Sequence, residues 1–269
     1  MNGDTTRARF TSALGWTGRY GIRLGTYPLD LCLFIFRTFQ KSLNTAPFRR
    51  RVIRRFAASQ LFLTCVETLP VIILAAVTVG FTFGAPLIAL VPDFGRDALT
   101  PVLLHIVGIE LGPLLTAVFL IRRAGAAMVV ELSNMQLHGE IAALEQLGID
   151  VQGFFIAPRL FGGALAQLVL ATYFTAAAVF IGILLAGLVI AGEITGLAEA
   201  ITMEIKPVLV LVFVLKNLLF GLIVTGAACY SAMQVTNSPT DVPHRTQEAM
   251  TNSLVLVFVV NALISLLPV

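Results

Sequence analysis

The sequence predicts an all-α integral membrane protein with an N-terminal interfacial helix, five transmembrane helices and a short cytoplasmic coupling helix between spans two and three. Of the 269 residues, 57% are hydrophobic and only 12% are charged, whereas soluble domains carry about 25% charged residues. Five apolar segments are each close to or above the ~20 residues that a transmembrane helix needs. No polar linker divides the chain, which indicates one membrane domain over residues 1–269.

The first part of this domain, residues 1–55, is basic and holds eleven of the eighteen Lys and Arg residues. Within it, the apolar run from Leu29 to Phe39 is too short to cross about 30 Å of hydrocarbon. An interfacial helix fits this pattern, with aromatic and aliphatic side chains in lipid and basic side chains at the headgroups. The expected lipid-facing residues are Phe34, Ile35 and Phe39, and the expected headgroup residues are Arg23, Arg37 and Lys41.

The five-span bundle fills residues 56–269, with predicted spans at 56–82, 101–121, 157–191, 207–231 and 250–268. The third is too long for one bilayer, so its start at Pro158-Arg159 is expected to project or to lie tilted. Pro, Gly, Asn and Asp residues predict loops at 83–100 and 232–249. Small residues at Gly80, Gly84, Gly182 and Ala186 permit close helix approach.

The distribution of basic residues predicts the orientation, because Lys and Arg accumulate in cytoplasmic loops. With the N-terminus in the cytoplasm, fifteen of the eighteen bases lie inside, including Arg122, Arg123, Arg159 and Arg245. Only Arg96 and Lys206 then lie outside, and Lys216 falls within a span. The C-terminus is therefore expected on the outside of the membrane.

The residue pattern offers no support for catalysis or for a bound metal or other cofactor. No Lys follows a Gly as a nucleotide-binding P-loop requires. The three histidines, His105, His138 and His244, sit in separate segments, whereas metal ligands cluster. We therefore expect a non-catalytic subunit without a cofactor of its own.

Three ionisable residues, Glu67, Glu110 and Lys216, fall inside predicted spans, about 15 Å from a helix end at 1.5 Å per residue. Such residues usually face a bundle interior or a cavity. Glu110 and Lys216 lie nine residues from Pro101 and Pro207, which places them at similar depth. They either form a polar spot in a translocation cavity or pair only to hold two helices together.

Between the second and third spans, Leu137, Ile141, Leu144 and Gly148 recur at the spacing of one helix face. Polar residues at Glu131, Gln136, Glu140 and Glu145 cover much of the remaining surface. A permease uses such a cytoplasmic helix to dock an ATPase. The alternative is a solvated or membrane-surface helix in a loop.

Several motifs together resemble the MlaE/YrbE family, the permease subunits of ABC systems that work with MCE proteins. They are Glu110-Leu111-Gly112-Pro113, Arg123-Ala124-Gly125-Ala126, Glu131-Leu132-Ser133-Asn134-Met135, Pro158-Arg159, Lys216-Asn217 and Phe220-Gly221. The chain departs from the family pattern at Ile109, Gly139-Glu140, Val151 and Arg245-Thr246-Gln247-Glu248.

This resemblance implies a homodimeric permease of the bacterial inner membrane that moves phospholipid or a similar hydrophobic molecule to or from a periplasmic MCE partner. A separate ABC ATPase subunit would bind and hydrolyse ATP, and no nucleic-acid partner is expected. The implied substrate-cavity residues are Glu110, Lys216, Glu67 and Leu111, and the implied ATPase-coupling residues are Arg123, Glu131, Met135, Glu140, Leu144 and Glu145. A channel or secondary transporter that works alone and a lipid-modifying membrane enzyme remain the alternatives.

Overall fold

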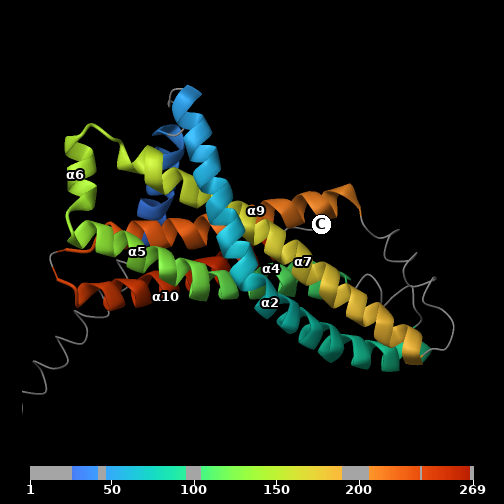
Figure 1. The fold of residues 1–269 in the computed structure, drawn as a ribbon. Helices are drawn as coiled ribbons and strands as arrows, with labels where there is room; N and C mark the ends of the chain where they lie inside the picture. The colour runs from blue at the N-terminus through green and yellow to red at the C-terminus, as the bar shows by residue number, and fades with distance from the viewer. Residues whose placement is uncertain (1–25, 42–46, 95–103, 190–205, 237, 267–269) are drawn as a thin grey trace, which may run out of the picture.

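A computed structural model describes residues 26–41, 47–94, 104–189, 206–236 and 238–266, and the regular structure in these ranges is helical (Figure 1). A first helix spans residues 26–41. It is followed by α2 (Pro47–Phe94), η1 (Leu104–Leu111), α4 (Gly112–Leu120), η2 (Ile121–Gly125), α5 (Ala126–Leu137), α6 (Glu140–Gln146), η3 (Gln152–Ile156), α7 (Ala157–Val189), α9 (Pro207–Ala232) and α10 (Asp241–Ser265). The η segments are π-helical turns.

Five helices in the described ranges are long and apolar enough to cross a membrane, which confirms the predicted fold class. They cover Ala57–Gly84, Leu104–Leu137, Gln152–Leu185, Pro207–Ala232 and Asp241–Ser265. The second is the centre of the bundle: 56% of its most apolar window is buried, against 17–33% for the other four. The remaining helices surround it with their apolar faces outward, as expected of helices that border lipid.

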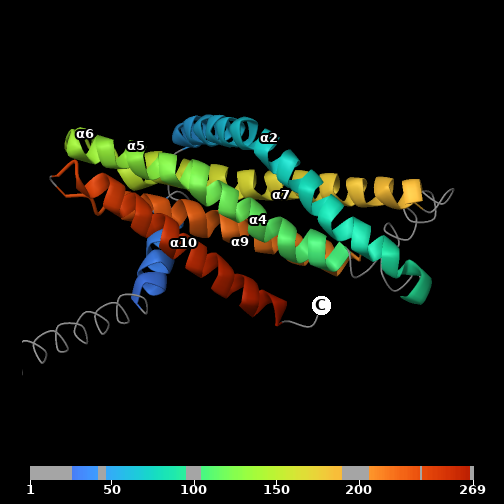
Figure 2. The ribbon, with the colours of Figure 1, turned by 90° about the horizontal axis from the view of Figure 1, so that it is seen from below.

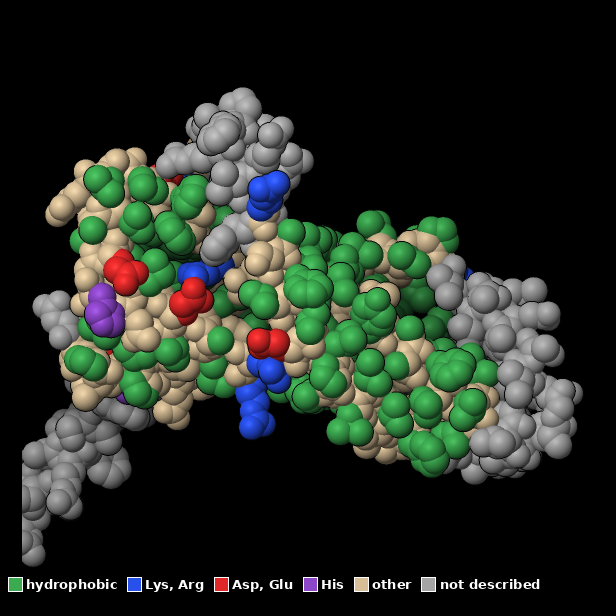
Figure 3. Space-filling model, viewed as in Figure 1, with side chains coloured by type: hydrophobic (Ala, Val, Ile, Leu, Met, Phe, Trp, Pro, Cys, Tyr) green, Lys and Arg blue, Asp and Glu red, His purple; other side chains and the backbone are tan. Residues whose placement is uncertain are grey.

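The long helices run side by side in an elongated bundle (Figures 1 and 2). Helix α2 crosses α7, α7 packs on α9, and α9 packs on α10. Figure 3 shows that hydrophobic side chains cover the part of this face formed by the second half of α2 and by α7, whereas charged side chains lie toward the α5–α6 end, in the middle and beside the first half of α2.

Glycines allow α2 and α7 to approach closely, as the small-residue spacing predicts. A Cβ atom on Gly80 would lie 2.6 Å from the carbonyl oxygen of Ala178, and one on Gly84 would lie 3.3 Å from the Cα atom of Gly182. A Cβ atom on Gly221 of α9 would likewise lie 2.5 Å from the Cα atom of Ala164 in α7. Backbones at this distance gain close van der Waals contact, which drives helix association in lipid.

The helix of residues 26–41 meets the prediction only in part. Phe34 packs edge-on against Tyr230 with ring centroids 5.6 Å apart, and Ile35 lies against Gly226. The expectation that Phe34 and Ile35 face lipid was therefore wrong, because the bare surface at Gly226 lets the helix dock on α9. The exposed apolar side chains of this helix are Leu29, Leu33, Phe36 and Phe39. Arg23 lies outside the described residues.

Helices occupy part of two predicted loops. Helix α2 continues to Phe94, through Pro86 and Pro92, because neighbouring groups can compensate for proline in a membrane helix. Helix α10 begins at Asp241, so Pro243 sits in its first turn, where backbone N–H groups need no intrahelical acceptor.

The predicted coupling helix is divided by a turn. The second span continues without a break through α5 to Leu137, and Gly139 then adopts a left-handed conformation with φ of 73° before α6 begins. The single apolar face predicted over residues 137–148 is therefore wrong, since a left-handed glycine ends a helix. Leu137 belongs to α5, whereas Ile141 and Leu144 belong to α6.

Candidate functional site

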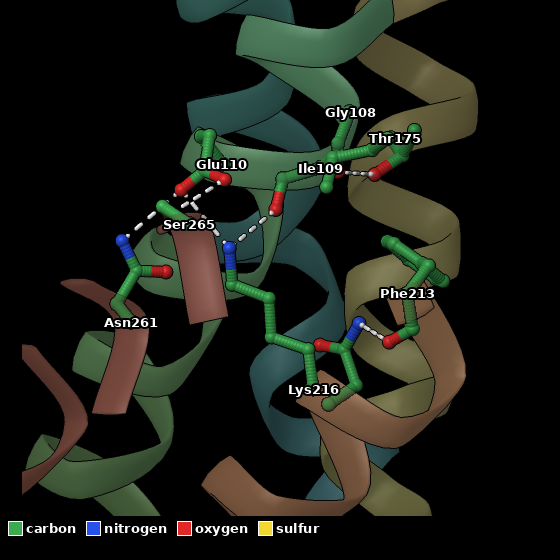
Figure 4. A network of polar contacts seen from close by, with 9 residues as sticks. Gly108, Ile109, Glu110, Thr175, Phe213, Lys216, Asn261 and Ser265 are labelled. Atoms are coloured by element: carbon green, nitrogen blue, oxygen red, sulfur yellow. Dashed lines mark hydrogen bonds and ion pairs between the residues drawn. The ribbon is translucent and has the colours of Figure 1, made fainter. Parts of the chain in front are cut away.

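Two backbone carbonyls of the central span that cannot bond to Pro113 accept hydrogen bonds from side chains of other helices. Proline has no N–H, so neither the carbonyl four residues before it, at Ile109, nor the one five residues before it, at Gly108, can bond to it. The Nζ of Lys216 donates to the Ile109 carbonyl at 3.0 Å, and the hydroxyl of Thr175 donates to the Gly108 carbonyl at 3.3 Å (Figure 4). Side chains of α9 and α7 thus donate to carbonyls of the central span that cannot bond to Pro113.

Glu110 joins three helices through its carboxylate. Its Oε2 accepts from the Nζ of Lys216 at 2.9 Å and from the Nδ2 of Asn261 at 3.1 Å, and its Oε1 accepts from the hydroxyl of Ser265 at 2.9 Å (Figure 4). Lys216 is on α9, whereas Asn261 and Ser265 are on α10. The structure therefore contains the Glu110–Lys216 ion pair expected from the matching depths of the two residues.

The two partners differ in exposure. The Lys216 side chain is fully buried, whereas 24% of the Glu110 side chain is exposed. Lys216 is thus enclosed between a carboxylate and a backbone carbonyl, and Glu110 is the member that another molecule can reach. A pair in this setting compensates the large cost of taking either charge out of water.

A second buried polar group lies beside this pair, and the sequence prediction missed it. The Nε2 of Gln167, on α7, lies 3.0 Å from the Pro113 carbonyl, 2.9 Å from the Thr116 hydroxyl and 3.2 Å from the Oδ1 of Asn217. Asn217 in turn donates to the Phe213 carbonyl at 2.9 Å. An amide in the apolar stretch of the third span was the available signal, because a buried polar side chain requires partners.

Glu67 and Leu111 were the other expected cavity residues. Glu67 lies 3.5 Å from Arg123, and about half of each side chain is exposed. Arg123 is thirteen residues beyond Glu110 along the same span, or about 20 Å at 1.5 Å per residue. The structure thus places Glu67 apart from the Glu110–Lys216 pair, whereas Leu111 follows Glu110 directly and is half-buried.

The expected ATPase-coupling residues gather at the α6 end, except for Arg123. Glu140 and Glu145 are exposed on α6, Leu144 is half-buried, and Met135 packs against the core. Glu131 forms a 2.6 Å ion pair with Arg159. Leu147, which directly follows α6, is 76% exposed, and the prediction missed it because it lies off the expected apolar face.

The described part of the chain brings no three His, Cys, Asp or Glu side chains together as a possible metal site. What it does bring together is a polar cluster around the central span and, at the other end of that span, an exposed acidic helix.

Comparison with known proteins identifies the family. The model of the permease MlaE family matches residues 57–267. The chain is 25% identical over 226 residues to a probable ABC transporter permease protein of Synechocystis sp., covering 80% of this chain and 82% of that relative. It is 26% identical over 215 residues, 78% of this chain and 61% of the relative, to the chloroplastic protein TRIGALACTOSYLDIACYLGLYCEROL 1 of Arabidopsis thaliana.

A further relative is the intermembrane phospholipid transport system permease protein MlaE of Haemophilus influenzae. It is 28% identical over 124 residues, which is 46% of this chain and 48% of that protein. The family match, in contrast, includes all five apolar helices of the bundle. The chain therefore belongs to the MlaE permease family.

Proposed function

We propose that this chain is the permease subunit of an ABC transporter that moves phospholipid, or a similar hydrophobic molecule, between the inner membrane and a periplasmic MCE partner. A separate ATPase subunit binds and hydrolyses ATP, and two copies of the chain form the transmembrane part. The chain acts as a single membrane domain, with its N-terminus in the cytoplasm and its C-terminus in the periplasm.

The partly exposed carboxylate of Glu110 carries this proposal. Apolar side chains that are more than half exposed adjoin two of its hydrogen-bond partners in the sequence: Leu215 precedes Lys216, and Leu266 follows Ser265. A phospholipid has the matching division, with a polar headgroup and apolar chains. Glu110 and Lys216 then form the polar edge of the lipid cavity, with Leu111 beside them. Glu67, which lies apart from this pair, would border the cavity nearer the cytoplasm.

The α6 end is the proposed docking surface for the ATPase. Glu140 and Glu145 offer negative charge, and the exposed Leu147 offers an apolar contact. Interfaces of this kind gain specificity from charge complementarity and affinity from desolvated apolar anchors. Met135 and Glu131 hold the end of α5 against which this surface is built, and Arg123 marks where the span leaves the membrane.

Purification of the chain expressed together with its neighbouring genes tests the proposal. We expect an ATPase subunit and an MCE protein to co-purify, phospholipid to be identified in the complex by mass spectrometry, and ATP to drive transfer of a fluorescent phospholipid from proteoliposomes. Lipid transfer by the chain alone, without ATP or a partner, would instead identify a channel or secondary transporter. A chemically altered lipid would identify an enzyme.

A further inference from the structure

Arg159 is the largest fully buried side chain in the described part of the chain. Its Nη2 donates to the Oε1 of Glu131 at 2.6 Å. Its Nε and Nη1 are buried and have no hydrogen-bond partner among the described residues. Only 1% of the Arg159 side chain is exposed, against 57% of the Glu131 side chain. A buried guanidinium thus depends on one carboxylate at the protein surface.

Such a pair does not serve stability well. Burying a guanidinium is costly, and two donors without acceptors add to that cost. Apolar residues of similar volume in place of a buried ion pair often leave stability unchanged or raise it. A role in geometry therefore accounts for the pair better than a role in stability does.

The pair closes a loop around α6. Glu131 and Arg159 are 28 residues apart in sequence, and the chain between them forms the end of α5, α6 and η3. Helix α5 packs mainly on α9 and α10, whereas α7 packs mainly on α2 and α9. In Figure 1, α6 stands across the end of the molecule between α5 and the start of α7. The ion pair is therefore a second link between these two supports, in addition to the chain that runs through α6.

We propose that Arg159 is a positioning residue, which holds α5 and α7 at a fixed separation through Glu131 and so sets the orientation of α6 for its partner. The consequence for the partner rests on the proposed function, whereas the effect on α6 is a property of this chain alone. Glu131 then acts through Arg159, and its exposed face keeps the pair within reach of a docked subunit.

The orientation of α6 can be measured by pulsed EPR on the purified full-length chain in nanodiscs. Spin labels are attached at Ala142→Cys on α6 and Leu165→Cys on α7, both exposed positions, after Cys32 and Cys65 are replaced by alanine. We expect a narrow distance distribution in the otherwise unaltered chain. Arg159→Met should broaden it while Tm stays unchanged or rises. Glu131→Gln should broaden it while Tm falls, because the buried charge loses its counter-ion.

The matched control is Asp150→Asn, which removes an ion pair of 3.4 Å with Lys41 in which both side chains are substantially exposed. That pair also ends near α6, but exposed pairs contribute little, so the distribution should stay narrow. In the complex with its ATPase, Arg159→Met should lower ATP hydrolysis about fivefold, and Asp150→Asn should leave it unchanged.

A narrow distribution in Arg159→Met would overturn the proposal. If this variant does not fold, a narrow distribution in Glu131→Gln would overturn it equally. If α6 loosens in the variants but no ATPase binds even to the unaltered chain, the positioning role stands and the proposed function fails.

Discussion

The ammonium group of Lys216 lies 2.9 Å from the Glu110 carboxylate and 3.0 Å from the Ile109 carbonyl oxygen. One buried side chain therefore neutralises a charge and satisfies a backbone acceptor that Pro113 cannot serve. Substitutions can separate these two roles of Lys216, because loss of the ion pair and loss of the hydrogen bond to the carbonyl predict different effects on stability.

The first prediction concerns the unequal burial of the ion pair. Glu110→Gln leaves the fully buried Lys216 without a counter-ion and should cost about 3–5 kcal/mol of stability. Lys216→Met leaves a carboxylate that is still partly exposed and should cost less. Thermal unfolding of both variants in detergent shows which substitution lowers stability more. If Lys216→Met is the more destabilising, the carbonyl of Ile109 is the more important partner.

The double variant Glu110→Gln/Lys216→Met decides between substrate contact and simple helix pairing. If the pair only holds helices together, the double variant should recover both stability and lipid transport. If it borders the lipid, the protein should stay folded yet transport poorly, which is the outcome that we expect. Recovery of full transport would remove both residues from the site.

The second prediction concerns Pro113. Pro113→Ala restores an N–H that can serve the freed carbonyl, so the protein should then tolerate Lys216→Met better. In a double-mutant cycle on unfolding free energy, we expect a coupling of about 1 kcal/mol between the two positions. Additive effects would show that Lys216 does not compensate for the proline.

The third prediction concerns the crossing of α2 and α7. Gly80→Val would place a side chain against the Ala178 carbonyl, 2.6 Å from the new Cβ, and should destabilise the bundle by at least about 1–3 kcal/mol. Thr78→Val, at an exposed position two residues earlier, is the control and should leave Tm unchanged. An unchanged Tm of Gly80→Val would mean that α2 and α7 can move apart at this position without loss of stability.

The fourth prediction concerns docking at α6. Leu147→Asp should abolish co-purification of the ATPase without lowering Tm, because this side chain is 76% exposed in the chain alone. Leu144→Asp should lower both, since the half-buried Leu144 also packs within the permease. Normal co-purification with Leu147→Asp would exclude this side chain as an anchor.

The fifth prediction concerns topology. A reporter active only in the periplasm should work when fused after Val269 and stay silent when fused after Asn237. The reason is the excess of basic residues on the side assigned to the cytoplasm. The reverse pattern of reporter activity would show that the chain has the opposite orientation in the membrane.

The sequence was sufficient to predict the spans and the Glu110–Lys216 pair, because each depends on local composition or on counting residues along a helix. It was not sufficient to predict the partners of Gln167 and Arg159. The partners of Gln167 lie 50 or more residues away in the sequence, and the partner of Arg159 lies 28 residues away. The surroundings of a polar side chain in an apolar helix depend on which neighbour it faces, and this is decided by packing.

The errors at Phe34 and Gly139 have a similar origin. An amphipathic segment beside a basic flank predicts a helix at the membrane surface but cannot reveal that Gly226 offers a docking surface for its apolar face. At Gly139, periodicity continued across a residue whose left-handed backbone conformation ends the helix. Periodicity describes which residues would share a face, whereas glycine determines whether the helix continues.

The central span has one further consequence, which is mechanical. Its 34 residues from Leu104 to Leu137 form one continuous helix that includes the π-helical segments η1 and η2, about 50 Å long at 1.5 Å per residue. Glu131 and Glu110 are twenty-one residues apart on this helix, so a tilt of about 5° at one would displace the other by roughly 3 Å. That displacement is as long as the bond between Lys216 and the Ile109 carbonyl. If the span tilts as one body, a small rotation at the α6 end is therefore large enough to lengthen the contacts of Glu110 beyond hydrogen-bond distance.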